Sequence, residues 1–217
     1  MDNTMTRTTF FSILKLAVAG LAMASLTGCA SLILGDGEVP PRYTLQPIAI
    51  STETVDPLRV RLVVTDPQSE AAFDTSRISF SPEPLRFEYY VEGEWTDQLP
   101  LLFGIFLQRN FENDGRVGTV GDRVSVPLGD YVLRTDIRAF HIQRRGDDRT
   151  ALVSYSAKLF NSRNEAIATR IFSTSEPVPG PGLDGSVEAL NRAARRSAVE
   201  TVDWTLELMR ANPVPTN

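Results

Sequence analysis

The stretch that decides the fold is DYVLRTDIRAFHIQRRGDDRTALVSYSAKLF, residues 130–160. Both halves alternate apolar and polar side chains with a period of two, which is typical of half-buried β-strands. In the second half, the alternating apolar residues are Val153, Tyr155, Ala157 and Leu159. The connection RRGDDR is short and polar, so it favours antiparallel pairing with Asp147 and Asp148 in a solvated turn.

The first half of this stretch changes its apolar phase midway. Tyr131, Leu133 and Ile137 share one face, but Ala139 and Phe140 break the alternation. One extra residue in a strand produces such a shift, so we predict a β-bulge or a bend at this point.

Further strands are predicted on both sides of the pair. The run EAIATRIF (165–172) predicts a third antiparallel strand that places Ile167 and Ile171 on one face. Upstream, Leu58, Val60, Leu62 and Val64 alternate with Arg59 and Arg61, which predicts another half-buried strand. Residues 77–91 contain two short strands separated by Ser-Pro-Glu-Pro, a composition that favours a hairpin.

Residues 97–113 switch to a helical period. The apolar stripe consists of Leu99, Leu102, Phe103, Phe106 and Leu107, extended by Phe111. Leu101 and Ile105 widen this stripe, so we expect the helix to be well buried. The predicted caps are Thr96 or Asp97 at the start and Gly115 at the end.

A second, longer helix is predicted over residues 184–210. Its apolar stripe consists of Val187, Leu190, Ala194, Ala198, Val202 and Leu206. Helices that fall between groups of antiparallel strands predict an α+β fold, a single two-layer α/β sandwich. We expect a mostly antiparallel sheet with two main helices packed on it.

The only cysteine, Cys29, follows the most apolar run of the chain. A basic segment precedes residues 16–26, which carry no charge and are too few to span a bilayer as a permanent helix. Leu26, Thr27 and Gly28 then resemble the lipobox of bacterial lipoproteins. This resemblance implies cleavage before Cys29, a diacylglyceryl thioether on its sulfur and an N-acyl chain such as palmitate. The alternative is an ordinary signal peptide with a buried cysteine.

These features divide the chain into parts. The predicted parts are a cleaved signal peptide (1–28), a lipidated N-terminus and tether (29–42), a folded domain (43–211) and a tail (212–217). Because Ala30 rather than Asp follows the cysteine, the resemblance favours the periplasmic face of the outer membrane. The net charge of −5 at pH 7 gives no indication of nucleic-acid binding.

The search for catalytic or metal-binding chemistry gives negative results. His141 is the sole histidine, and no Gly-x-Ser-x-Gly motif accompanies it, so a structural role is expected. Glycines 115, 118 and 121 lack phosphate-loop spacing and are interpreted as turns around a short strand. Metal-ligand spacing is absent from the sequence, and we expect no cofactor and no enzymatic activity.

Aromatic residues gather in FEYYVEGEW, residues 87–95. If the strand alternates, Tyr89 and Tyr90 point to opposite faces. Tyr89, Tyr90 and Trp95 form a candidate partner surface, because exposed Tyr and Trp are favoured anchors at interfaces. The alternative is that one set is core and the rest shield the start of the helix. Trp204 is expected to pack against the core.

Several segments together resemble the ABC-type transport auxiliary lipoproteins. The segments are YTL (43–45), FDTSRISF to TVGD (73–122), DYVLRTDIRAF (130–140), YSAKLF (155–160) and RIF (170–172). The combination includes an Arg-Ile strand, a tyrosine strand, a tryptophan before a helix that begins with Leu-Pro, and a Tyr-x-Leu-x-x-Asp strand. It covers residues 43–206, nearly the whole predicted mature chain.

The resemblance implies a non-enzymatic role in an MCE-type intermembrane lipid transport system. The implied partners are an MCE-domain protein that bridges the periplasm, and through it an ABC ATPase and a permease. A homo-oligomer is compatible with this role. The alternative function is that of a lipoprotein that activates a periplasmic peptidoglycan synthase. A third interpretation, a lipid-modifying hydrolase, predicts activity that depends on His141 or a carboxylate.

Overall fold

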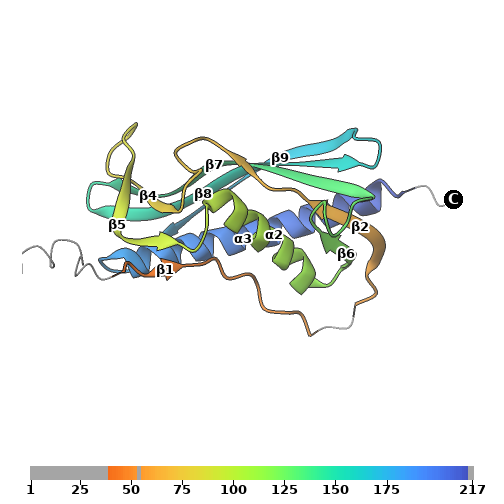
Figure 1. Ribbon diagram of the computed structural model, residues 1–217, viewed down its shortest axis with the longest axis horizontal. Coiled ribbons are helices and arrows are strands. Elements are labelled where there is room, and N and C mark those ends of the chain that lie inside the picture. The colour runs from red at the N-terminus through yellow and green to blue at the C-terminus, as the bar shows by residue number, and fades with distance from the viewer. Residues whose placement is uncertain (1–38, 53–54, 215–217) are drawn as a thin grey trace, which may run out of the picture. The chain divides into compact units, whose positions relative to one another are not determined.

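The computed structural model describes residues 39–52 and 55–214 of the chain (Figure 1). The described residues from Pro40 onwards belong to one compact unit. The strands are β1 (Arg42–Tyr43), β2 (Leu58–Val64), β3 (Gln68–Ser69), β4 (Arg77–Ser81), β5 (Glu88–Trp95), β6 (Val117–Gly121), β7 (Tyr131–Arg145), β8 (Asp148–Asn161) and β9 (Ala166–Pro177). The helices are α2 (Leu99–Asp114) and α3 (Leu183–Ala211).

Strands β7, β8 and β9 form the antiparallel meander that the sequence predicts. β7 and β8 pair from Tyr131 opposite Asn161 to the turn at Arg145 and Asp148. The register shifts between Ile137 and Ala139, which confirms the predicted bulge. β9 continues the sheet on the far side of β8. Figure 1 shows β7, β8 and β9 as the longest strands of the sheet.

The predicted inward face of β9 is wrong. Ile171 is 54% exposed, whereas its neighbour Phe172 is buried. The cause is a register shift in the β8–β9 ladder, where Leu159 pairs with Ala168 but Phe160 pairs with Ala166. Because side chains alternate with a period of two, one extra residue turns the following side chains to the other face.

The other edge of β7 pairs with three short strands in succession. β2, β3 and β4 each lie parallel to β7, one after another along its length. β6 then pairs parallel with β2, and β1 pairs parallel with β5. The predicted β4–β5 hairpin is confirmed as an antiparallel pair. Parallel pairing was not predicted, because it joins segments far apart in the chain and no local turn marks it.

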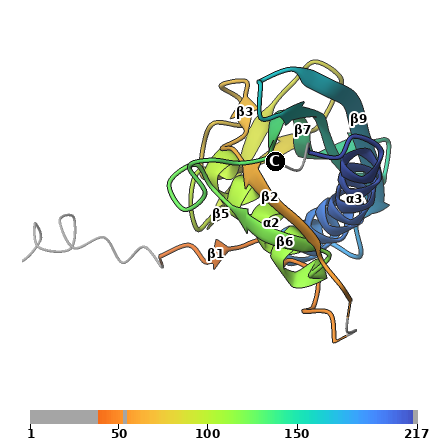
Figure 2. The same ribbon diagram turned by 90° about the vertical axis from the view of Figure 1, so that its right-hand side faces the viewer.

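The two helices cover one face of this open sheet. Figure 2 looks nearly along α3 and shows the strands curving around both helices. The predicted stripe of α3 is fully buried, and so is that of α2. The fold class predicted from the sequence, two helices packed on a large and mostly antiparallel sheet, is therefore confirmed.

Helix α2 differs from its prediction in two details. Leu101 and Ile105 are 40% and 39% exposed, so the apolar stripe is narrower than expected. Neither Thr96 nor Asp97 is the N-cap, because the helix begins after Gln98 and no side chain caps it. Pro100 lies in the first turn, where its missing N–H needs no partner. The predicted end at Gly115, which adopts φ 78°, is correct.

An aromatic row crosses the core from α2, over strands β8 and β9, to α3. Phe103 of α2 meets Tyr155 edge to face, with 4.9 Å between the ring centroids. Tyr155 stacks on Phe172 at 5.6 Å, and Phe172 meets Trp204 at 5.7 Å. The Tyr155 hydroxyl is paired with Thr201 Oγ1 at 2.7 Å, so this buried polar group is satisfied. Trp204 therefore packs against the core, as predicted.

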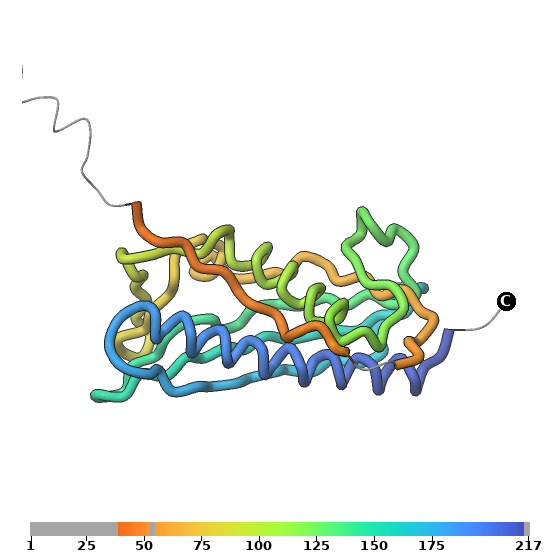
Figure 3. The backbone as a smooth tube through the Cα atoms, turned by 90° about the horizontal axis from the view of Figure 1, so that it is seen from below, coloured from red at the N-terminus to blue at the C-terminus, as the bar shows by residue number. Residues whose placement is uncertain are grey.

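Residues 43–51 run as an extended strap along the two helices (Figure 3). The side chain of Asn191 in α3 accepts a hydrogen bond from the Gln46 amide at 2.9 Å. Asn110 in α2 accepts one from the Ile48 amide at 3.1 Å. Among the described residues, only Tyr43 of the strap pairs with a strand, so these side chains satisfy backbone N–H groups farther along it.

Candidate partner surfaces

The predicted lipid-anchor residues Leu26, Thr27, Gly28 and Cys29 lie outside the described residues and stay predictions. The described chain enters the domain at β1, which pairs with the end of β5, and the β7–β8 turn lies at the same end of α3 (Figure 1). We call this the β1 end. The opposite end carries β6, the β8–β9 turn and residues 212–214, and we call it the β6 end. Helix α3 runs between them, and its 29 residues span about 44 Å.

Trp95 belongs to the core rather than to a surface. Its side chain is 1% exposed, and its ring meets Phe140 edge to face at 5.8 Å between centroids. A side chain so deeply buried cannot anchor a partner on this surface. The prediction that Trp95 contributes to a partner surface is therefore wrong, and its alternative, a core position, is correct.

Tyr89 and Tyr90 are half-buried, and each hydroxyl bonds within the domain. Tyr89 donates to the Ala72 carbonyl at 3.2 Å, and the Arg77 guanidinium lies 3.9 Å above its ring. The Tyr90 hydroxyl pairs with Ser186 Oγ at 3.2 Å, at the start of α3. The two tyrosines therefore attach β5 to different parts of the domain. A contact between their exposed edges and a partner stays a prediction.

The most exposed apolar side chains of the β4–β5 hairpin are other residues. Leu85 is fully exposed, Val91 is 86% exposed and Phe87 is 42% exposed. Leu85 also adopts φ 68°, in the left-handed region that residues other than glycine rarely occupy. We call Leu85, Phe87 and Val91 the hairpin patch. Leu85 and Val91 are aliphatic and carry no local sequence signal of exposure, unlike the aromatic cluster around them.

His141 lies beneath the hairpin patch. It is 7% exposed, its ring stacks on Phe73 at 6.1 Å, and Phe87 meets it edge to face at 5.0 Å. Its Nδ1 has no hydrogen-bond partner within the described part of the chain. Burial lowers the pKa of His141 to about 4, so the imidazole is neutral at neutral pH. This is the structural histidine that the sequence predicts, without the hydrogen-bonded carboxylate of a catalytic triad.

A groove of about 820 Å³ opens at the β6 end. Its apolar lining comes from β2, β7, α3 and the segment after α3, and consists of Leu58, Val60, Tyr131, Met209 and Val214. We call it the β6-end groove. Two exposed apolar residues of the β6–β7 loop, Val124 and Leu128, lie at the same end and are 89% and 74% exposed.

The rim of the β6-end groove is basic. Arg59 and Arg210 line it, and neither has an ion-pair partner among residues 39–52 and 55–214. Arg61 differs, because its Nη2 and Nε donate to the Asp130 carboxylate at 2.9 and 3.2 Å. These hydrogen bonds hold the pKa of the Asp130 carboxyl below its usual value. Arg59 and Arg210 are therefore available to an acidic partner.

Tyr131 holds one wall of the groove in place. Its hydroxyl donates to the carbonyl oxygens of Met209, at 3.3 Å, and Asn212. A second hollow of about 480 Å³ adjoins the first and shares Tyr131, Pro213 and Val214 with it. The segment after α3 thus separates two adjoining hollows. No local sequence signal marks this contact, because Tyr131 and Asn212 are 81 positions apart.

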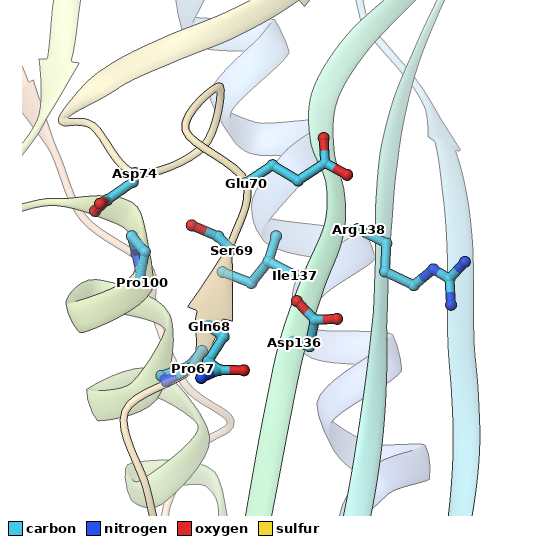
Figure 4. Close-up of a pocket in the computed structure, with 9 residues that line it drawn as sticks. All are labelled: Pro67, Gln68, Ser69, Glu70, Asp74, Pro100, Asp136, Ile137 and Arg138. Atoms are coloured by element: carbon cyan, nitrogen blue, oxygen red, sulfur yellow. The ribbon is translucent and has the colours of Figure 1, made fainter.

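A polar hollow of about 750 Å³ lies between β3, β7 and the start of α2 (Figure 4). Its lining includes the carboxylates Glu70, Asp74 and Asp136. Figure 4 shows Ser69 pointing towards Pro100, whereas Arg138 points in the opposite direction. The described residues contain no cluster of His, Cys, Asp or Glu side chains suited to a metal ion. These polar groups therefore do not converge on a common point.

Within the described ranges, no helix is both long enough and apolar enough to cross a membrane.

Comparison with known proteins identifies relatives of both sequence and fold. The chain is 28% identical over 149 residues to the uncharacterized protein bll6063 of Bradyrhizobium diazoefficiens, a match over 69% of this chain. The match spans only 40% of that relative's length.

Two solved structures share the fold. Protein XCC0632 from Xanthomonas campestris has a TM-score of 0.72 at 22% identity, over 79% of this chain and 98% of that one. The hypothetical protein CT253 from Chlamydia trachomatis has a TM-score of 0.51 at 9% identity, over 71% of this chain and all of that one. The family model for the ABC-type transport auxiliary lipoprotein component matches residues 43–202. The chain therefore belongs to the ABC-type transport auxiliary lipoprotein component family.

Proposed function

We propose that this protein is an accessory subunit of an ABC/MCE-type phospholipid transport system, anchored to the periplasmic face of the outer membrane. It works without catalysis and docks the MCE component that spans the periplasm. The observation that carries this proposal is the family match, which covers residues 43–202 and thus nearly every described element. The lipid on Cys29 supplies the anchor, and two or more acyl chains make such an anchor stable.

The positions of the two ends support a division between anchoring and docking. The chain that leads to Cys29 leaves the domain at the β1 end. The β6-end groove lies at the other end of α3, so in an anchored molecule it is free to face a partner across the periplasm. An apolar groove with a polar rim is the usual form of a specific protein-binding site.

The chemistry of the groove defines the segment that it fits. Leu58, Val60 and Met209 offer an apolar floor, and Arg59 and Arg210 offer positive charge at the rim. A segment of the MCE component with an apolar face and acidic flanking side chains complements both. Charge complementarity of this kind contributes mainly to the association rate and to specificity.

The test is crosslinking of the natively expressed protein in cells, followed by purification and mass spectrometry of the attached proteins. Recovery of an MCE-domain protein is the expected result. Recovery of a peptidoglycan synthase without an MCE-domain protein would contradict the proposal and favour the alternative function. The mass of the purified chain tests the anchor separately, because loss of residues 1–28 and addition of acyl chains to Cys29 each change the mass by a defined amount.

A matched pair of variants tests the groove. Replacing Arg59 and Arg210 by Glu reverses the rim charge and should reduce recovery of the MCE-domain protein. The control is Arg195→Glu, an exposed arginine of α3 with no ion-pair partner among the described residues. Equal recovery from all variants would remove the groove from the docking surface.

A further inference from the structure

We propose that the hairpin patch is a second membrane contact, which rests on the lipid bilayer that holds the Cys29 anchor. This inference rests on the proposed anchor and extends it, because it assigns a lipid-facing role to side chains of the folded domain. Its ligand is a phospholipid surface, bound by apolar side chains of the β4–β5 hairpin at the level of the headgroups. The tether and the hairpin together would then set the orientation of the domain.

The short chain between Cys29 and β1 limits how far the β1 end can lie from the bilayer. Fully extended, the segment from Cys29 to Val39 spans at most about 35 Å. A lipid on Cys29 therefore keeps the β1 end close to the bilayer. β1 pairs parallel with the C-terminal end of β5, at Glu94 and Trp95, so the incoming chain lies beside the hairpin strand, and the turn with Leu85 precedes the other end of this strand. The hairpin belongs to the same end of the domain (Figure 1).

The backbone conformation of Leu85 indicates that its side chain makes a contact outside the chain. Leu85 is fully exposed and adopts φ 68°, so it accepts an unfavourable backbone conformation without burying its side chain. Asn or Gly would adopt this conformation more readily and expose no apolar surface. An exposed apolar residue at a position of backbone strain points to a contact outside the chain.

The charges around the hairpin indicate which kind of lipid surface it can bind. Arg86 and Glu88 form an exposed ion pair at 2.6 Å, and Glu83 and Glu92 are also exposed. The hairpin therefore carries no excess of positive charge for anionic lipids. Burial of Leu85, Phe87 and Val91 would drive the contact instead. We expect it to form on a mainly zwitterionic bilayer and to depend little on salt.

The test places a fluorophore on the hairpin of the full lipidated protein. A Leu85→Cys variant labelled with an environment-sensitive dye is reconstituted in phosphatidylethanolamine vesicles that contain a minor fraction of phosphatidylglycerol and spin-labelled lipid. Because Cys29 is the only native cysteine and its sulfur carries the lipid, the new thiol is the only free one. The matched control is Val124→Cys, which labels an equally exposed apolar residue at the β6 end.

The expected result is blue-shifted emission and several-fold stronger quenching at Leu85→Cys than at Val124→Cys. Equal and weak quenching at both positions in a chain of lipidated mass would overturn the hairpin contact and leave the anchor intact. A chain without lipid would instead overturn the anchor on which the proposal rests. Protection of Leu85→Cys only after addition of a protein partner, without lipid quenching, would also overturn the contact and assign the hairpin to that protein.

A second measurement avoids labels. Leu85→Asn suits the positive φ and Val91→Thr suits a strand, so the double variant should fold normally. In a chain that begins at residue 29 and carries Cys29→Ser, so that the apolar run 16–26 is absent, the double variant should bind the same vesicles about tenfold more weakly than Cys29→Ser alone. Val124→Thr with Leu128→Asn removes similar apolar surface at the β6 end and should leave binding unchanged. An equal loss in both double variants would contradict the proposal.

Discussion

The hairpin patch and the β6-end groove both expose apolar side chains, but they differ in shape and charge. The hairpin patch is a projecting turn without an excess of positive charge, whereas the groove is a concave surface of about 820 Å³ whose rim carries two arginines without an ion-pair partner among the described residues. A projecting apolar turn suits a soft, extended surface such as a bilayer. A groove with a charged rim suits a shaped partner. The difference in shape and charge is the reason why we propose a different contact for each end.

The largest expected effect comes from the core that joins the two ends. Phe103 is fully buried at the centre of the aromatic row. Phe103→Ala should lower the free energy of unfolding by about 3–5 kcal/mol, because it leaves a cavity and removes ring contacts. Urea denaturation measures the change. Leu101→Ala on the exposed side of the same helix is the control, with an expected loss under about 1 kcal/mol. Similar losses in both variants would show that the row is not the centre of the core.

The next largest effect is a pH dependence of the folding stability, which comes from buried His141 near the β1 end. Burial holds the pKa of His141 at about 4 against a normal value of 6.5, so the unfolded chain takes up a proton at higher pH than the folded one. The stability that neutral, buried His141 contributes is fully present above pH 6.5 and is lost as the pH falls towards 4. The shift corresponds to about 3 kcal/mol.

The measurement is the free energy of unfolding as a function of pH, compared between the native protein and His141→Leu. Other groups titrate in both proteins, so the difference between the two curves isolates the histidine. We expect the difference to grow in favour of His141→Leu as the pH falls. Parallel curves would contradict a buried neutral histidine.

A smaller effect is expected at the β6 end. Tyr131→Phe removes the hydroxyl that donates to Met209 and Asn212, and should lower stability by about 1 kcal/mol. Hydrogen exchange of the backbone amides of residues 210–212 and Val214 should accelerate, and crosslinking of the MCE-domain protein should decrease. Tyr89→Phe removes one comparable hydrogen bond near the β1 end and should leave the exchange of these amides unchanged. Faster exchange in Tyr89→Phe but not in Tyr131→Phe would show that Tyr131 does not hold the C-terminal segment in the groove wall.

The smallest effect has the opposite sign. Leu85→Gly relieves the positive φ and should raise the free energy of unfolding by about 0.5–1 kcal/mol. The control is Leu128→Gly, a 74% exposed residue without a positive φ, which should not gain stability. Thermal unfolding distinguishes them. If Leu85→Gly gains nothing, the strain argument for an external contact fails.

The sequence predicts the meander and both helices well, because their signals are local. Alternation of Val153, Tyr155, Ala157 and Leu159 reports one buried face, and the buried stripe of α3 follows the helical period in the same way. Strands β2, β3 and β6 pair in parallel with segments that are distant in sequence. The periodicity of a strand does not indicate which distant segment it pairs with. The bulge near Ala168 reversed the predicted face at Ile171 because it is a single-residue change of register.

The candidate surfaces were less predictable. The aromatic cluster in β5 pointed to the correct hairpin but to the wrong residues, because Trp95 is buried and both tyrosine hydroxyls bond within the domain. Leu85 looks unremarkable in sequence, and its significance comes from its φ angle and full exposure. The β6-end groove combines β2, β7 and residues 212–214, so no single stretch of sequence indicates it.

The most direct test of the account compares the two ends in the same cells. A photo-crosslinking amino acid is placed at Val60 in the β6-end groove or at Leu85 in the hairpin patch, and the crosslinked products are analysed by mass spectrometry. We expect an MCE-domain protein attached at Val60 and phospholipid attached at Leu85. An MCE-domain protein attached at Leu85, with none at Val60, would contradict the assignment of the two ends.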